Sequence, residues 1–198
     1  METHKPTDSV TTAPNGVGGA VGVDSARWYV AIVNHNSEKA TAQRLAKAGY
    51  TVYVATQEEM RLWRNGRRAM VERVVIPSLV FIRCTERERL EAVKLPYIYR
   101  FMTNKAATPQ TVGRPVAVIP DVQIEQLRFM LGHSDSPVMF AERPLAHGDK
   151  VRVIRGGLRG LEGEVVALPD GKSQLQIRLD ILGCATVQIN TIDLEHIG

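Results

Sequence analysis

Short apolar runs alternate with amphipathic stretches between residues 28 and 132, and this alternation predicts a mixed unit of strands and helices. The run WYVAIV at 28–33 has the length and the β-branched and aromatic content of a buried strand. Good helix formers follow between Ser37, an N-cap residue, and Gly49, which ends the helix. The pattern then repeats, with strands expected at 51–56, on both sides of Asn65-Gly66 within 60–76, at 79–84 and at 97–102, and helices expected after Thr85 and over 121–132. The predicted order is β-α-β-β-β-α-β-α.

Two of these boundaries have specific sequence signals. Asn65-Gly66 lies between two extended segments and is a dipeptide that tolerates the positive φ angles of a tight hairpin turn. Thr85 and Glu88 have the spacing of a capping box, so a helix should start there and stop before Pro96. We therefore expect a β-hairpin and a capped helix inside this unit.

The pattern changes after Gly148 to short alternating segments separated by glycine-rich or Pro-Asp-Gly turns. The segments are KVRVIR, GEVVAL, QLQIRL and ATVQI. Alternation of apolar and polar residues indicates strands with one buried face, and several such strands in succession are typical of a small antiparallel barrel. The predicted fold class is therefore α+β, with an all-β second domain.

Segments without either periodicity divide the chain. Residues 1–26 are rich in Thr, Pro, Gly and Ser and bury too little apolar surface to offset the ordering of their backbone, so we expect a disordered tail. Residues 133–146 contain two prolines and no sustained period, which favours a linker over a regular element. The two predicted domains are residues 27–132 and 147–198.

The positive charge of the chain is concentrated in the predicted hairpin. The 198 residues include 25 Lys and Arg against 21 Asp and Glu, which gives a formal net charge of +4. Residues 61–73 contain five arginines and a single acid, Glu72, so this stretch alone accounts for that charge. Guanidinium groups bind phosphate oxygens and stack on bases, and an indole ring adds a stacking surface. We predict nucleic-acid binding, rather than a merely solvated hairpin, through Arg61, Trp63, Arg64, Arg67, Arg68 and Arg73.

No motif in the sequence indicates catalysis, a metal site or a cofactor. The five histidines and the two cysteines, Cys84 and Cys184, show neither metal-ligand spacing nor the signature of an activated nucleophile. Gly171-Lys172-Ser173 imitates the end of a P-loop, but Val166 stands where that loop has its first glycine. The lack of such signatures predicts a non-enzymatic protein. Two distant cysteines and the lack of a long apolar run predict a cytoplasmic protein without a membrane span.

The second domain resembles the KOW motif in its alternating start and its spaced glycines. The matching residues are Gly148, Asp149, Val151, Val153, Gly157, Gly160, Gly163 and Val165. The stretch QIRLDILGCATVQI resembles the closing strands of the KOW domain in the NusG family of transcription elongation factors. The first domain is similar to the N-terminal domain of that family in WYVAIV, GYTVYVATQEE, NGRR and ERVVIPSLVFI, in this order. The resemblance implies a ferredoxin-like or RNP-like α/β sandwich followed by a five-stranded, SH3-like KOW β-barrel.

The resemblance also implies where partners bind the first domain. In the NusG family an apolar surface of this domain binds the clamp of the largest RNA polymerase subunits, and the hairpin lies beside upstream DNA and the non-template strand. By position, the matching apolar surface consists of Ile32, Leu79, Phe81, Phe101 and Met102. Each single residue could instead fill the domain's own core, since alternate strand residues do so. The set as a whole is expected to form an exposed binding surface.

In the family, the barrel contacts the termination factor Rho or a ribosomal small-subunit protein through an aromatic residue in the loop before Gly183. Ile181 and Leu182 occupy this loop here, so the expected contact is apolar without a ring. Rho should therefore bind this chain less tightly than it binds a general NusG. Basic residues such as Arg155 and Arg159 leave nascent RNA open as a further partner.

The predicted function is transcription elongation or antitermination by a monomer. KLPYIYRFM and VIPDVQIEQL resemble the UpxY-type antiterminators of capsular polysaccharide operons, which implies an operon-specialised factor. The alternative is a ribosome-associated or general RNA-binding KOW protein, because such barrels also occur in ribosomal proteins and the chain is basic. Against it, charge is nearly balanced over residues 74–198, whereas an RNA-dominated binder usually spreads its basic residues along the chain.

Overall fold

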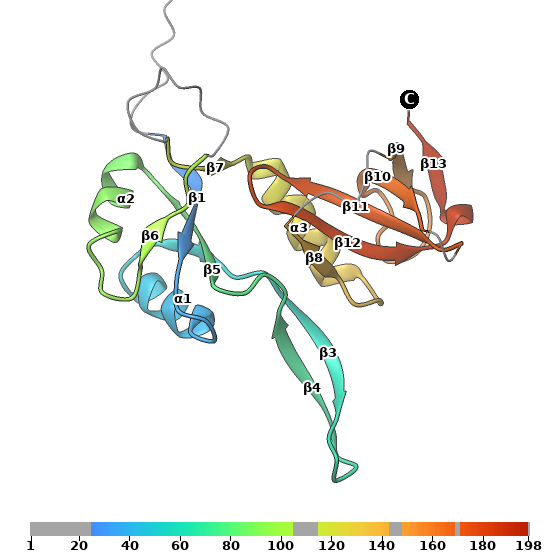
Figure 1. Ribbon diagram of the computed structural model, residues 1–198, viewed down its shortest axis with the longest axis horizontal. Coiled ribbons are helices and arrows are strands. Elements are labelled where there is room, and N and C mark those ends of the chain that lie inside the picture. The colour runs from blue at the N-terminus through green and yellow to red at the C-terminus, as the bar shows by residue number, and fades with distance from the viewer. Residues whose placement is uncertain (1–24, 105–114, 143–147, 169–170, 198) are drawn as a thin grey trace, which may run out of the picture.

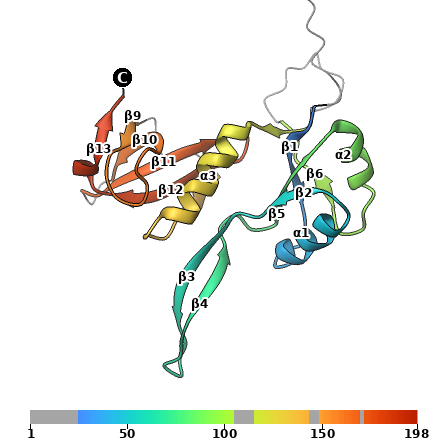
Figure 2. The ribbon, with the colours of Figure 1, turned by 180° about the vertical axis from the view of Figure 1, so that it is seen from behind.

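The antiparallel strands form an N-terminal sheet, a C-terminal sheet and a separate two-stranded hairpin, and the helix α3 (Asp121–His133) lies between the first two (Figures 1 and 2). The computed structural model describes residues 25–104, 115–142, 148–168 and 171–197. The tail predicted over residues 1–26 lies almost entirely outside these ranges. The N-terminal sheet has the strand order β2-β5-β1-β6, and β7 also pairs with β1. Its strands are β1 (Arg27–Ile32), β2 (Thr51–Tyr53), β5 (Leu79–Cys84), β6 (Arg100–Phe101) and β7 (Val118–Ile119).

The two faces of the N-terminal sheet are covered by different elements. Successive strand residues point to opposite faces, so β1 places Tyr29 and Ala31 on one face and Trp28 and Val30 on the other. Two helices, α1 (Glu38–Lys47) and α2 (Glu86–Ala92), contribute to the apolar cluster on the Tyr29 face. The opposite face, which we call the inner face, belongs to a buried cluster that includes α3 and the C-terminal sheet.

The predicted helix starts are confirmed, and one of them has the predicted side-chain cap. The Thr85 hydroxyl accepts a hydrogen bond from the Glu88 amide at 3.2 Å, and the Glu88 carboxylate accepts one from the Thr85 amide at 2.8 Å. This reciprocal pair is the capping box. α1 begins directly after Ser37, but the Ser37 hydroxyl donates to the Asn34 carbonyl at 2.6 Å instead of capping the helix.

The strands β3 (Thr56–Leu62) and β4 (Arg68–Val74) form the predicted hairpin, which extends away from both sheets (Figure 1). The Trp63 amide donates to the Arg67 carbonyl at 2.9 Å and closes a three-residue loop. Gly66 has φ +77°, and it is the residue of the Asn65-Gly66 pair that adopts the left-handed conformation. A left-handed glycine at the last position of such a loop is a frequent hairpin geometry, since glycine meets no steric cost there.

The C-terminal sheet has six strands in the order β13-β9-β10-β11-β12-β8, where the family resemblance implies five. They are β8 (Met139–Ala141), β9 (Asp149–Val153), β10 (Glu162–Ala167), β11 (Ser173–Leu179), β12 (Gly183–Ile189) and β13 (Leu194–His196), the last preceded by the 3-10 helix Thr191–Asp193. The four alternating segments correspond to the strands from β9 to β12. The prediction of a linker without regular elements over 133–146 is wrong for Met139–Ala141, which pair with Cys184–Thr186.

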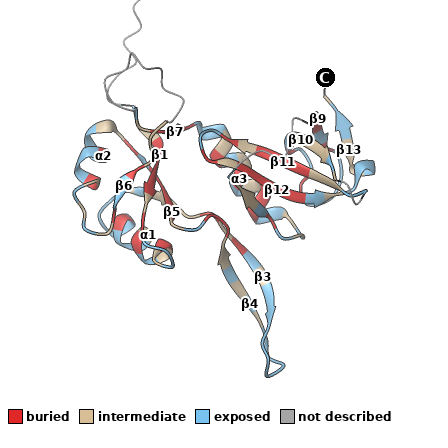
Figure 3. Ribbon diagram, viewed as in Figure 1, coloured by how far each residue is buried: buried red, intermediate tan, exposed pale blue. Residues whose placement is uncertain are grey.

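α3 packs against both sheets. Four of its residues are buried in the cluster of the inner face, namely Ile124, Leu127, Met130 and Leu131. The guanidinium carbon of Arg128 lies 4.5 Å from the ring centroid of Tyr53 in β2 and 5.1 Å from that of Trp28 in β1, both strands of the N-terminal sheet. On the other side, the Asp180 amide donates to the Gln123 side-chain oxygen at 2.8 Å. One apolar cluster therefore includes residues of the N-terminal sheet, α3 and the C-terminal sheet. Figure 3 shows buried residues in strands of both sheets and in α3.

An ion pair across two strands stabilises the C-terminal sheet. Arg178 in β11 donates from Nε and Nη2 to the two carboxylate oxygens of Glu164 in β10, each at 2.8 Å. The Gly148 amide adds a hydrogen bond at 3.3 Å. These donors, Arg178 above all, lower the pKa of Glu164 from 4.5 to about 2. Because the folded pKa lies below the unfolded one, the stabilisation is fully present above pH 4.5 and is lost as the pH falls toward 2.

We expect the Glu164→Gln variant to lose about 2–3 kcal/mol of unfolding free energy at neutral pH, since both side chains are only partly exposed. Urea unfolding across the acid range measures this loss, and the variant should show a flatter dependence on pH below 4.5. Glu162→Gln, which breaks the exposed pair with Arg152, is the control and should change the acid dependence much less. Wild-type acid sensitivity in Glu164→Gln contradicts the assignment.

Candidate binding surfaces

Five of the six residues predicted to bind nucleic acid lie at the tip of the hairpin. The side chains of Arg64, Arg67 and Arg68 are all exposed. The guanidinium carbon of Arg61 lies 4.8 Å from the ring centroid of Trp63, a cation–π contact that orders the indole among the arginines. Trp63 is 44% exposed, so its ring is available for stacking. The tip therefore combines phosphate-binding and base-stacking groups.

Arg73 lies at the opposite end of the hairpin, at its base. It is half-buried, and its Nε donates to the Glu59 carboxylate at 2.8 Å. Its Nη2 donates to the Val138 carbonyl at 2.9 Å. The expectation that Arg73 belongs to the same basic surface as the tip is wrong, because its guanidinium is engaged by the protein itself.

The hairpin also has exposed apolar side chains, which the sequence analysis did not predict. Met60 and Met70 are paired across β3 and β4 and are 61% and 55% exposed. Leu62, two residues along β3 and so on the same face, is 63% exposed. Their alternation with charged residues was the available signal, but the arginines dominated the interpretation of this stretch. The hairpin thus has an apolar face as well as a basic tip.

An apolar groove of about 460 Å³ lies between the two halves of the chain. The N-terminal half lines it with Val75, Ile76, Pro77, Leu79, Met102 and Thr103, and the C-terminal half with Phe140, Glu142, Ile181 and Leu182. Since β4 ends at Val74, the hairpin leads directly into the first lining residues. Ile32 pairs with Leu79 between β1 and β5 and is half-buried against the inner-face cluster.

Three of the five residues predicted to form an exposed apolar surface are buried, namely Leu79, Phe81 and Phe101. Phe81 is fully buried on the inner face, where its ring centroid lies 5.7 Å from that of Tyr53. Phe101 is 4% exposed and lies on the other face, with its ring edge-on to Tyr29 at 6.2 Å. The expected exposed surface is therefore wrong for Leu79, Phe81 and Phe101. Leu79 is 9% exposed and lines the groove, whereas Ile32 and Met102 are half-buried.

The loop before Gly183, predicted to contact a partner of the second domain, faces this same groove. Ile181 is 39% exposed and has φ +73°, whereas Leu182 is 5% exposed. Both line the groove on the side opposite Leu79 and Met102. Each of the two predicted protein-binding elements therefore partly covers the other in this arrangement.

The residues of the KOW resemblance form the start of the C-terminal sheet. Asp149, Val151 and Val153 lie in β9, where the two valines are buried. Gly163 and Val165 lie in β10. Gly148 directly precedes β9, and Gly157 and Gly160 lie between β9 and β10.

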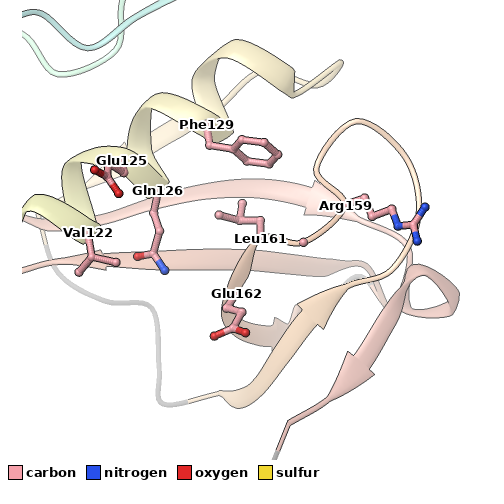
Figure 4. Close-up of a pocket in the computed structure, with 8 residues that line it drawn as sticks. Val122, Glu125, Gln126, Phe129, Arg159, Leu161 and Glu162 are labelled. Atoms are coloured by element: carbon pink, nitrogen blue, oxygen red, sulfur yellow. The ribbon is translucent and has the colours of Figure 1, made fainter.

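A second hollow, of about 420 Å³, separates α3 from the connection between β9 and β10 (Figure 4). Its lining residues are Val122, Glu125, Gln126, Phe129, Arg159, Gly160, Leu161 and Glu162. Sequence reasoning missed this hollow because it assigned α3 wholly to the first domain. The contact of α3 with the C-terminal sheet was therefore not expected.

A buried carboxylate shapes the end of the N-terminal sheet beside Ile32 and Leu79. Glu38, which is 3% exposed, accepts hydrogen bonds from the Ser78 amide at 2.6 Å and the Asn36 amide at 3.3 Å. Ser78 and Asn36 have φ angles of +63° and +62°, in the left-handed region that non-glycine residues rarely adopt. The carboxylate thus holds the loops after β1 and before β5 in a conformation that their sequence alone does not favour.

We expect Glu38→Ala to lower the free energy of unfolding by about 2 kcal/mol, because it leaves two backbone donors without their acceptor. Denaturant unfolding measures the loss. Glu91→Ala removes an exposed partner of Lys94 and serves as the control, with an expected loss of less than about 1 kcal/mol. Equal losses in the two variants would contradict the structural role of Glu38.

Two further observations concern chemistry and membranes. Within the described ranges, no three His, Cys, Asp or Glu side chains lie close enough together to hold a metal ion. None of the helices in the described part of the chain combines the length and the apolar character that a membrane crossing requires.

Comparison with known proteins identifies the family. The family described as "Transcription termination factor nusG" matches residues 26–128, which is more than half of the chain and includes the N-terminal sheet, the hairpin and most of α3. The chain belongs to the NusG family. NusG proteins are non-enzymatic transcription factors, so this chain is a NusG-like transcription termination/antitermination factor.

Three known proteins are similar to this chain over much of its length. The transcription termination/antitermination protein NusG of Thermus thermophilus is 24% identical over 179 residues, covering 82% of this chain and 93% of the relative. A solved structure described as domain interaction in Thermotoga maritima NusG is 16% identical, covers 89% of this chain and all of that chain, and has a TM-score of 0.47. A chain of the solved MjSpt4:Spt5 complex in conformation B is 15% identical to this chain. The match covers 86% of this chain and 96% of that chain, with a TM-score of 0.28.

Proposed function

We propose that this NusG-family chain binds the clamp of RNA polymerase through the apolar residues at the groove and suppresses pausing or termination. One observation carries the proposal: β4 joins an exposed basic tip to the residues that line an apolar groove. An apolar groove fits a protein partner, and a tip of arginines and a tryptophan fits nucleic acid. A surface that joins both is suited to a protein enzyme that encloses DNA.

The proposed action requires binding alone. If the groove residues hold one side of the polymerase cleft and the hairpin holds upstream or non-template DNA, opening of the enzyme around its transcript is disfavoured. A preference of a few kcal/mol for the closed state shifts such a two-state equilibrium by roughly a hundredfold or more. This is enough to change the outcome at a pause site or a terminator.

The arrangement of the two halves sets a condition on this binding. Leu79 and Met102 share the groove with Phe140, Ile181 and Leu182 of the C-terminal half. A polymerase surface of any size needs the N-terminal side of the groove to be free. We therefore infer that the C-terminal sheet moves away from the groove when polymerase binds, which also exposes the apolar loop at Ile181 for a second protein partner.

A more specific part of the proposal is that the chain acts on particular operons. The stretches that resemble UpxY-type antiterminators, residues 94–102 and 118–127, include β6, β7 and the first part of α3. We propose that the chain serves particular operons, and that its C-terminal sheet, with Leu182 where the family has an aromatic residue, binds Rho weakly. Titration of the purified chain with Rho tests this point, and tight binding overturns it.

A transcription assay across a terminator, with and without the full chain, tests the main proposal. We expect increased read-through together with retention of the chain on purified polymerase elongation complexes. Unchanged read-through and no retention overturn the proposal. Equally strong binding to ribosomes or naked RNA would instead favour the general RNA-binding alternative.

A further inference from the structure

The stretch from the last residue of α3 to the end of β8 is held at several points by the hairpin and by the C-terminal sheet. We call residues 133–142 the connecting segment. It includes β8, which pairs with β12 through Met139, Phe140 and Ala141. A simple tether would not be expected to form such contacts with the domains that it joins. The contacts therefore point to a role in positioning the two halves.

At its first part, the connecting segment is bound by the base of the hairpin. Gln57, in β3, is 5% exposed and accepts a hydrogen bond from the Val138 amide at 2.8 Å. Its side-chain amide donates to the Ser136 carbonyl at 3.0 Å and to the Ser134 carbonyl at 3.4 Å. These partners are backbone groups, so one glutamine side chain binds the segment much as a neighbouring strand would.

Arg73, on the facing strand β4, completes this contact. Its Nη2 donates to the Val138 carbonyl at 2.9 Å, while its Nε is fixed by Glu59 at 2.8 Å. The register pairs Gln57 directly with Arg73 between the two strands. Both the amide and the carbonyl of Val138 are thus bound by one cross-strand pair, and Val138 itself is fully buried.

The C-terminal half binds the start of the connecting segment through close backbone contact. A Cβ atom built on Gly157 would lie 2.3 Å from the His133 carbonyl oxygen, a distance that real Cβ atoms do not reach. Gly157 is therefore required where the end of α3 meets the C-terminal half. Its φ is not in the left-handed region, so this contact, rather than the local backbone, is what excludes a side chain.

We propose that Gln57 and Arg73 form a latch on the connecting segment, and that this latch holds the C-terminal sheet in place across the apolar groove. Phe140, in the latched segment, lines the groove together with Leu182. With the latch closed, β8 stays paired with β12 and the groove stays shared between the two halves. With the latch open, the connecting segment is free to lengthen, and the two halves separate. The latch itself does not depend on the proposed function, whereas its effect on polymerase binding does.

The first test replaces Gln57 with alanine in the full chain. Amide hydrogen exchange at Val138 should rise by roughly tenfold, since its acceptor is lost, and small-angle X-ray scattering should show a larger radius of gyration. Glu58→Ala changes the exposed neighbour on the same strand and should leave both quantities as in the wild type. Protection of the amides between β11 and β12 shows whether the variant remains folded.

The second test changes a residue of the C-terminal half that contacts the connecting segment, and it leaves the hairpin unchanged. Gly157→Ala should separate the two halves because its methyl group collides with the His133 carbonyl. Gly132→Ala, one residue before His133, adds a methyl group where the described residues leave open space, and should keep the compact scattering profile. The pair distinguishes a specific collision from a general effect of alanine at the end of α3.

The outcomes separate the latch from the proposed function. An unchanged radius of gyration in both folded variants, Gln57→Ala and Gly157→Ala, overturns the latch. An expanded chain in both variants supports it, whatever polymerase does. If the expanded variants bind polymerase no more tightly than the wild type, the latch stands and the proposed role of the groove is contradicted.

Discussion

Replacing Arg67 and Arg68 together with glutamate should weaken binding to a transcription elongation complex by roughly 100-fold at low salt. Both side chains are exposed beside the hairpin loop, where they can reach phosphates. Each phosphate contact contributes about one unit to the dependence of the logarithm of affinity on the logarithm of salt concentration. The double variant should therefore lose about two units of slope. Titration of elongation complexes at several salt concentrations measures both quantities.

The matched control for this variant is a double charge reversal at Lys47 and Arg87. These residues are exposed on α1 and α2, which cover the face of the N-terminal sheet away from the groove. The control changes the net charge of the chain by the same amount. If it reduces affinity and slope as much as the hairpin variant does, the effect is one of overall charge, and the proposed contact of the tip with DNA is wrong.

Replacing Ile32 and Met102 together with aspartate should weaken retention on RNA polymerase by roughly 100-fold or more. Half-buried apolar side chains at the centre of an interface commonly contribute the largest losses when changed, and a charge there must be desolvated as well. Ile32 and Met102 are suitable because they are half-buried, whereas a charge at the fully buried Phe81 would disrupt the core. The measurement is binding of the full chain to purified polymerase.

Leu90→Asp is the control for this second variant. Leu90 is 49% exposed on α2, on the other side of the N-terminal sheet. Thermal unfolding of all variants shows whether lost binding follows from lost structure. Retention of the Ile32→Asp/Met102→Asp chain at wild-type strength would show that polymerase is bound elsewhere.

Local signals in the sequence predicted most of the elements. The capping box at Thr85, the helix start after Ser37 and the hairpin loop at Gly66 each depend on a few neighbouring residues. The interactions that form these features can therefore be predicted from a few consecutive residues. The tip arginines were found for the same reason, since charge density is a local property.

The errors arose where the result depends on contacts between distant segments. Phe101 and Met102 are consecutive, and alternation places consecutive strand residues on opposite faces, so they could not share one surface. β8 has three residues and no alternation of its own, and it forms because β12 offers an edge. Likewise, the pattern of Ile124 and Leu127 shows that α3 has an apolar face but not that two sheets cover it. Arg73 was assigned by its charge, whereas its position in the register decides its role.

The position of α3 has a consequence for exchanging parts between relatives. Its apolar residues complete the interior of both halves, so neither half has all of its own packing partners if the chain is divided after residue 132 or after residue 146. A chimera that takes its C-terminal strands from another NusG protein would place a foreign surface against Leu127 and Met130. An exchange of parts between relatives therefore has to keep complementary residues on both sides of α3, because the helix contacts the N-terminal sheet as well as the C-terminal one.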